Sequence, residues 1–259
     1  MLYATSLSDA SWSLIEPFFE VHTGPGRHRK YSQRTIIDAC FYVVDNGTKW
    51  RNLPNDFPPW KTVYHYFRSW SESGIWEQIN LILVGAVRFS EGREESPSLA
   101  SIDSQSQTAE PGISGRGLDG GKKVNGRKRH IAVECLGLML SCICTSANTA
   151  DSKAGEILVT RLNNEELFPR LSKILGDNSY RTVGNLLRVP VSVESEERKP
   201  GTKGFVPEAF RWAVERTFAW LNRQRRLVRN YEKNPNHQTS MNYIGNIRIC
   251  LKRLTKWLS

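Results

Sequence analysis

Three acidic residues stand at places from which a fold could bring their side chains together. Asp103 and Asp177 each end a short run that is typical of a β-strand, and Glu215 lies within a long helical pattern. The carboxyl ends of neighbouring strands border one crevice, so the side chains there can converge. Carboxylate oxygens are hard ligands suited to Mg²⁺ or Mn²⁺. Because Asp and Glu are common, the positions of these residues matter more than their number.

Two clusters of basic residues are the second chemical feature. One lies in a Gly-rich stretch, 112–129, that we expect to be a loop, and the other continues the helical pattern past Glu215. Residues 211–229 hold six Arg and one Glu, a surplus that calls for an outside anion such as phosphate. For the loop, an ordinary solvated segment is the alternative. The expected phosphate contacts are Lys122, Lys123, Arg127, Lys128 and Arg129 in the loop, and Arg211, Arg223, Arg225, Arg226 and Arg229 in the helix.

Charge is distributed unevenly along the 259 residues, whose net charge is +10. Residues 1–95 carry 10 basic and 11 acidic side chains, whereas residues 96–259 carry 26 and 15. Nearly all the capacity to bind a polyanion therefore lies in the later part. The composition, 39% apolar and 24% charged with 19 Gly and 12 Pro, excludes collagen-like, coiled-coil and wholly disordered chains.

A helix expected between Pro59 and Gly74 has a basic side opposite an aromatic one. Lys61, His65 and Arg68 are spaced to lie on that basic side. The recognition helix of a helix-turn-helix needs this arrangement, with apolar anchors behind and donors for phosphates and bases in front. An amphipathic helix with an ordinary solvated face is an equally good interpretation, because this third of the chain has no basic excess.

The order of elements predicts a mixed α/β fold. Ser8 and Ser32 can cap helices in the first third, and a polar segment, 90–97, follows the last helix there. The remainder reads as strand, hairpin, helix, strand, helix, strand, helix, which indicates a mixed five-stranded sheet flanked by helices. We therefore expect a small all-α, helix-turn-helix-like domain at 1–95 and a catalytic domain at 96–259. The expected strands are 98–103, 130–135, 138–144, 174–177 and 189–193, and the expected helices are 154–162, a stretch through 171, and 208–227.

Several residues allow two interpretations. Cys142 and Cys144 would share a strand face as buried reduced thiols or, less favoured, belong to a zinc site. His130 fits a packed strand residue better than a metal ligand, and Asp151 fits either a helix cap or an acidic neighbour of the site. No base is readable beside a Ser, Cys or Tyr, which disfavours a covalent route. With neither a membrane-spanning run nor a signal peptide in the sequence, we expect a cytoplasmic protein.

Two blocks match a known family with high specificity: 121–130, Gly-Lys-Lys-Val-Asn-Gly-Arg-Lys-Arg-His, and 214–221, Val-Glu-Arg-Thr-Phe-Ala-Trp-Leu. The blocks at 50–54, 102–104 and 147–153 agree with it. On these residues the chain resembles, over almost its whole length, the DDE transposases of bacterial insertion sequences, specifically the insertion sequence 5 family.

The resemblance implies an RNase H-like core in which Asp103, Asp177 and Glu215 form a metal-binding triad. It implies nicking at the terminal inverted repeats of an element, then joining of the freed 3′ hydroxyls to target DNA. Two Mg²⁺ or Mn²⁺ ions about 3.5 to 4 Å apart would serve this reaction, with Asp103 bridging both. The implied partners are DNA, at the bacterial nucleoid, and a second copy of the chain in a homodimer.

The chain departs from the family pattern on the Glu helix and after the second Asp. Glu208 and Asn222 stand where related transposases often have Tyr and Lys, and Ser179 stands where Gly is common. Two alternatives stay open: a nuclease with the same core that never joins ends, and a catalytically inactive DNA-binding regulator or decayed element protein.

Overall fold

The first third of the chain is helical, as the capping residues predict. The computed structural model describes residues 3–19, 30–185, 187–193 and 211–256. The Ser8 side chain accepts a hydrogen bond from the backbone N–H of Ser11, and the Ser32 side chain accepts one from Thr35, so both predicted caps are confirmed. The helical elements here are α1 (Asp9–Ile15), η1 (Glu16–Phe18), α2 (Gln33–Asn46), η2 (Trp50–Asn52), α3 (Trp60–Glu72) and α4 (Ile75–Ser90).

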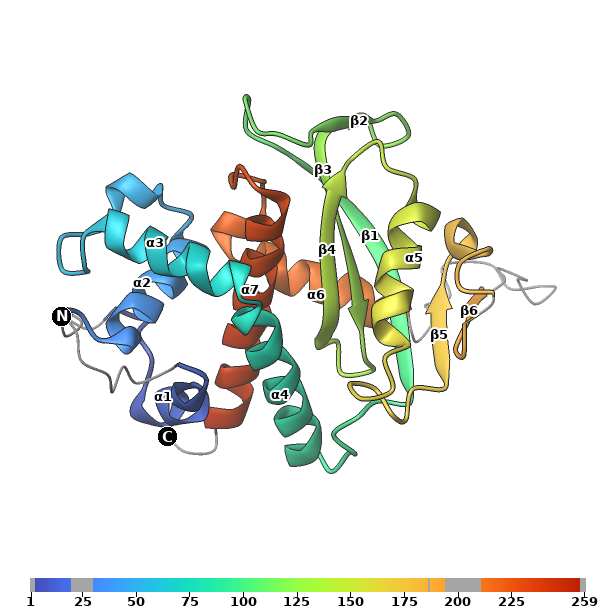
Figure 1. The fold of residues 1–259 in the computed structure, drawn as a ribbon, viewed down its shortest axis with the longest axis horizontal. Helices are drawn as coiled ribbons and strands as arrows, with labels where there is room; N and C mark the ends of the chain where they lie inside the picture. The colour runs from blue at the N-terminus through green and yellow to red at the C-terminus, as the bar shows by residue number, and fades with distance from the viewer. Residues whose placement is uncertain (1–2, 20–29, 186, 194–210, 257–259) are drawn as a thin grey trace, which may run out of the picture.

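A mixed sheet follows, made of β1 (Leu99–Thr108), β2 (Gly117–Asp119), β3 (Val124–Val133), β4 (Met139–Ser146), β5 (Lys173–Gly176) and β6 (Val191–Val193). The strand β3 pairs antiparallel with β1, β2 and β4, whereas β1 with β5, and β5 with β6, are parallel. The helix α5 (Asp151–Leu162) covers one face, and α6 (Arg211–Asn222) passes behind the other (Figure 1). The predicted mixed, RNase H-like fold is confirmed, and β2 is an additional short strand.

Two strands are longer than predicted because polar residues pair with one another. β1 continues five residues beyond Asp103, and β3 begins at Val124, so the expected loop is wrong over 124–129. The two extensions form one antiparallel ladder, from Ser104 opposite His130 to Thr108 opposite Gly126. Backbone hydrogen bonds hold this ladder together. Its polar and charged side chains lack the apolar alternation by which a strand is recognised in a sequence.

Three helical predictions need correction. The expected helical stretch through Leu171 does not form among the described residues. The described part of the Glu215 helix ends at Asn222 and is followed by the short turn η4 (Arg225–Leu227), while the expected start at 208–210 lies outside the described residues. The N-cap position of α5 is occupied by Ala150 rather than Asp151, so no side chain caps this helix.

The helix α7 (Pro235–Thr255) was not predicted, and it connects the two halves of the molecule. It packs against α2 and α4 on one side and β4 on the other (Figure 1). Within that contact, Asn246 Nδ2 donates to Asn80 Oδ1 at 2.7 Å, and Asn80 Nδ2 donates to the Met139 carbonyl at 2.7 Å. One continuous apolar core therefore runs through both halves. The division into domains at residue 95 stays a prediction.

The helices that the structure describes were also compared with the requirements for crossing a bilayer. None of them combines the necessary length with sufficient apolar character.

Candidate active site

Asp103 and Asp177 lie level with each other at the edge of the parallel part of the sheet. Ser101 of β1 pairs with Leu175 of β5, and each aspartate lies two residues further along its strand direction. Both aspartates line one small hollow, together with Val214 of α6. Asp177 Oδ1 accepts the backbone N–H of Ser179 at 2.9 Å, which holds its side chain at the start of a short helical turn, η3 (Asn178–Tyr180). The predicted convergence of two acids at one crevice is therefore present.

Glu215 lies on the same helix as Val214 but does not itself line the hollow. The apolar side chains of Val214, Phe218 and Leu221 are buried as α6 packs on β1 and β3, and Glu215, next to Val214, is exposed. Among the residues that the structure describes, no three His, Cys, Asp or Glu side chains are close enough together to hold one ion. The three-carboxylate site thus stays a prediction. The two aspartates fit a single Mg²⁺, which commonly takes one or two carboxylates and completes its shell with water and substrate phosphate.

Tyr180 is a buried neighbour of the aspartates that the sequence did not single out. Its side chain is 1% exposed, and its ring packs closely on Gly155 of α5. Burial raises the pKa of the Tyr180 phenol, and the negative charges of Asp103, Asp151 and Asp177 raise it further. The fields of three carboxylates therefore meet at this phenol. The signal that could have identified Tyr180 is the sequence Asp-Asn-Ser-Tyr, which starts at Asp177.

Asp151 contacts the strand that carries Asp103. Its Oδ1 accepts a hydrogen bond from Ser104 Oγ at 2.9 Å and from Lys128 Nζ at 3.0 Å. The expected role as a helix cap is wrong, because this side chain turns to the sheet rather than to the first turn of α5. Asp151 is therefore the acidic neighbour that the alternative interpretation described.

His130 is a packed strand residue, as the favoured interpretation held. It is fully buried, and its Nε2 lies 2.9 Å from Thr145 Oγ1. Burial lowers the pKa of His130 from 6.5 to about 4, although the charge of Asp151 opposes this shift. The five cysteines are free, in agreement with reduced thiols.

The lowered pKa of His130 predicts acid-sensitive folding. The unfolded chain protonates this imidazole near pH 6.5, and the folded chain does so only near pH 4, so stability present above pH 6.5 is lost as the pH falls toward 4. We expect this residue to account for a loss of about 2–3 kcal/mol. Urea unfolding at pH 7.0, 5.5 and 4.5 measures it, with His130→Gln as the reference. Equal pH slopes for wild type and variant would rule this origin out.

Four of the expected phosphate contacts are buried and serve as internal cations. Arg127 donates to the carbonyls of Glu232 at 2.7 Å and Lys233 at 2.6 Å. Burial lowers the pKa of Arg129 to about 10, and its guanidinium lies over the Phe218 ring. Arg129 also donates to Asn222 of α6 and Asn242 of α7. Lys128 pairs with Asp151, and Arg226 pairs with Glu232. The expectation that these four face DNA is wrong, because each side chain is buried and bonded to other groups of this chain.

Other basic residues remain at the surface. On α3, Lys61, His65 and Arg68 are exposed together, as expected for a groove-reading face, and Arg68 lies 3.4 Å from Glu72. Their contact with DNA stays a prediction. The side chain of Arg211 lies outside the described residues. The remaining candidates are Lys122, Lys123, Arg223 and Arg225, which are exposed, and Arg229, which pairs with Glu110 at 3.3 Å.

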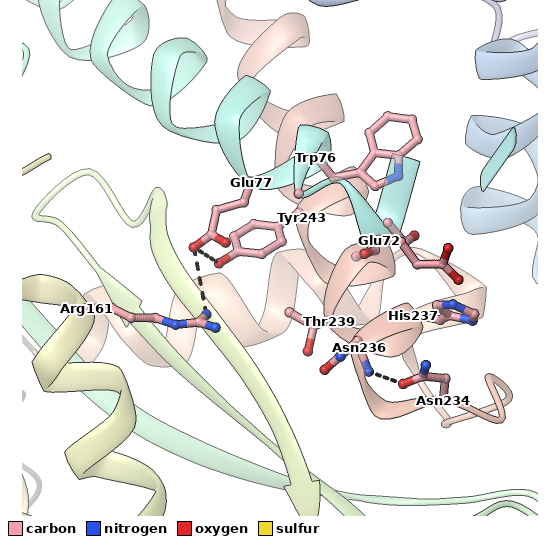
Figure 2. Close-up of a pocket in the computed structure, with 12 residues that line it drawn as sticks. Glu72, Trp76, Glu77, Arg161, Asn234, Asn236, His237, Thr239 and Tyr243 are labelled. Atoms are coloured by element: carbon pink, nitrogen blue, oxygen red, sulfur yellow. Dashed lines mark hydrogen bonds and ion pairs between the residues drawn. The ribbon is translucent and has the colours of Figure 1, made fainter. Parts of the chain in front are cut away.

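A separate pocket of about 330 Å³ lies between the turn joining α3 to α4, α5 and the start of α7 (Figure 2). The Tyr243 hydroxyl donates to Glu77 at 2.9 Å, and Arg161 lies 3.8 Å from the same carboxylate. Glu72 and His237 form the opposite wall, and burial lowers the pKa of His237. With two carboxylates against one guanidinium, the pocket is a poor phosphate site, and none of the three predicted catalytic acids lines it.

Comparison with protein families assigns the chain. Residues 7–80 match the family described as "Putative transposase of IS4/5 family", and residues 94–198 and 177–252 match two models described as "Transposase DDE domain". The chain belongs to the DDE transposases of insertion sequences. The two DDE matches together contain every strand of the sheet, the hollow and α6 of this transposase.

Two curated relatives support this assignment. The transposase is 27% identical over 107 residues to the insertion element IS402 uncharacterized 16.2 kDa protein of Burkholderia cepacia, covering 39% of this chain and 71% of the relative. It is 26% identical over 77 residues to the uncharacterized protein y4sN of Sinorhizobium fredii, covering 30% of this chain and 62% of that relative. No solved structure matches the chain.

Proposed function

We propose that this transposase binds the terminal inverted repeats of its element, nicks the DNA there and joins the freed 3′ hydroxyls to a target. The observation that carries the proposal is the level placement of Asp103 and Asp177 in one hollow, beside the helix that bears Glu215. We also propose that it acts in the bacterial cytoplasm, at the nucleoid, where its DNA substrate lies. Because two element ends must be held together, we further propose that it acts as a homodimer.

The acidic residues at and near the hollow would have different roles in holding metal ions. Asp103 and Asp177 would hold one Mg²⁺ or Mn²⁺ ion, and Glu215 would contribute to holding a second once the substrate phosphate is present. Such ions activate the attacking oxygen and stabilise the leaving one. The raised pKa of Tyr180 keeps its phenol protonated, so it adds no charge to the hollow.

The surface cations would hold the substrate outside the hollow. Lys122 and Lys123 lie in the turn between β2 and β3, and Arg223 and Arg225 follow α6. All four are exposed, which suits them to contact phosphates rather than to read bases. Affinity for DNA should therefore fall steeply with salt.

Strand nicking tests the proposal directly. Purified protein is incubated with labelled inverted-repeat DNA and Mg²⁺ or Mn²⁺, and we expect a nick at the element end. Asp103→Ala should make this nick about a thousandfold more slowly, because several kcal/mol of charge stabilisation in the transition state is lost. Glu91→Ala, which removes an exposed carboxylate after α4, is the matched control and should nick normally. If wild type nicks no faster than Asp103→Ala, catalysis at this hollow is wrong.

The same reactions separate the alternatives. Hydrolysis without any joined product would favour a nuclease. The exposed basic face of α3 favours a DNA-binding regulator as the second candidate, and sequence-selective binding without cleavage in either metal would support it.

A further inference from the structure

An alternating stack of indole and guanidinium groups lies along one side of α6. Trp212, Arg216 and Trp220 follow one another at intervals of four residues, and Arg253 of α7 completes the stack. The Arg216 guanidinium lies 4.1 Å from the Trp212 ring centroid and 4.7 Å from that of Trp220. The Arg253 guanidinium lies 4.9 Å from the Trp220 centroid. We call these four residues the Trp–Arg stack.

The turn between β3 and β4 fixes the stack in place. Arg216 Nη2 donates to the Cys135 carbonyl at 3.4 Å, and Arg253 Nη2 donates to the Leu136 carbonyl at 3.4 Å. A Cβ on Gly137 would lie 3.1 Å from both Arg216 Nη2 and the Trp220 ring, so this turn fits closely under the stack. The Trp220 ring and the two guanidinium groups are therefore positioned before any ligand binds.

The outer end of the stack is open to solvent and positively charged. Trp212 is 51% exposed, although a Trp of a helix usually buries its ring against the core. Between described residues, neither Arg216 nor Arg253 forms an ion pair with a carboxylate; the nearby acid Glu134 is instead paired with Arg88. An exposed aromatic ring beside unneutralised cations is the combination by which proteins bind unpaired nucleotides.

Trp212 lies on the same helix as the predicted catalytic residue Glu215. It precedes Glu215 by three residues, and residues at this spacing are neighbours on a helix surface. A nucleotide held at Trp212 would thus lie within one helical turn of Glu215. In a duplex the faces of the bases are covered by their neighbours except at the two ends, so this ring favours an unpaired base.

We propose that the Trp–Arg stack binds unpaired nucleotides of single-stranded DNA, with a base against Trp212 and the adjoining phosphates near Arg216 and Arg253. This inference rests on the proposed function, because it names the DNA strand that the same site would hold after cleavage. It goes beyond that function in assigning a single-strand subsite to residues outside the carboxylate set.

Fluorescence anisotropy with a labelled 20-nucleotide strand and the corresponding duplex tests the subsite, in buffer containing EDTA. We expect Trp212→Ala to bind the single strand about tenfold more weakly, the loss expected when one base loses its stacking partner. Binding of the duplex should change less than twofold, and Trp212→Phe should retain most of the single-strand affinity. Phe89→Ala, which removes a 70% exposed aromatic side chain from α4, is the matched control and should bind both DNAs as wild type does.

The outcomes are distinct from those of the nicking assay, since neither metal nor cleavage is involved. An unchanged single-strand affinity for Trp212→Ala would overturn the subsite, even if nicking proceeds normally. Equal losses for single strand and duplex, or tighter Trp212-dependent binding of an RNA of the same length, would overturn it too. A selective loss for single-stranded DNA would support it, even in a protein that fails to nick.

Discussion

Glu215→Gln should abolish strand cleavage yet leave one divalent ion bound at the hollow. Asp103 and Asp177 line that hollow together, whereas Glu215 is exposed on α6 and is not among the lining residues. A pair of carboxylates with water ligands suffices for one ion of the Mg²⁺ type. We therefore expect the cleavage rate of Glu215→Gln to fall about a thousandfold, because stabilisation of the reacting oxygens by the second ion is lost.

Electron paramagnetic resonance of Mn²⁺ measures the bound ion independently of activity. Asp103→Asn and Asp177→Asn should lose both the ion and cleavage, whereas Glu215→Gln should lose cleavage alone. Glu156→Gln, which changes an exposed carboxylate on α5, is the control and should keep both. The two-aspartate site is wrong if Glu215→Gln loses Mn²⁺ as completely as Asp177→Asn does.

Glu232→Gln should destabilise the protein more than any surface change would. Arg226 Nη2 donates to Glu232 Oε1 at 2.6 Å, with only 5% and 3% of the two side chains exposed. Arg226 Nη1 also donates to the Thr48 carbonyl at 3.0 Å, so the pair joins η4 to the first third of the chain. Removing one partner leaves a buried charge uncompensated, which typically costs about 3–5 kcal/mol. The melting temperature should fall by roughly 5–10 °C.

A second ion pair nearby supplies the control. Arg229 and Glu110 lie 3.3 Å apart, but their side chains are 41% and 51% exposed. Glu110→Gln should therefore change the free energy of unfolding by less than about 1 kcal/mol. Melting followed by circular dichroism compares both variants with wild type. Equal melting temperatures for Glu232→Gln and Glu110→Gln would contradict a structural role for Arg226 and reopen its assignment to DNA.

The elements that sequence reasoning located correctly are those whose signals are local. Ser8 and Ser32 satisfy backbone donors within one turn, and Gly47 ends α2 with the positive φ of +70° that glycine tolerates. The hairpin of β3 and β4 turns at Gly137, also at positive φ. Even the level placement of the two aspartates follows from strand ends alone, because parallel neighbours share a carboxyl edge.

The burial of Arg127 and Arg129 could not be predicted, because most of their partners are distant in the sequence. Arg127 binds carbonyls more than a hundred residues away, and Arg129 binds side chains of α6 and α7. A run of basic residues in isolation looks like a solvated loop, since only the folded chain provides acceptors for it. Helix α7 was missed for a related reason: its buried face includes Asn242 and Asn246, whose polarity conceals an interior helix.

The position of α7 has a consequence for synthesis in the cell. Because this helix fills the space between α2, α4 and the sheet, the apolar sides of α2 and α4 that it covers stay uncovered until residues 235–255 have left the ribosome. A chain cut short before these residues would therefore expose the apolar side of α4 to chaperones and proteases.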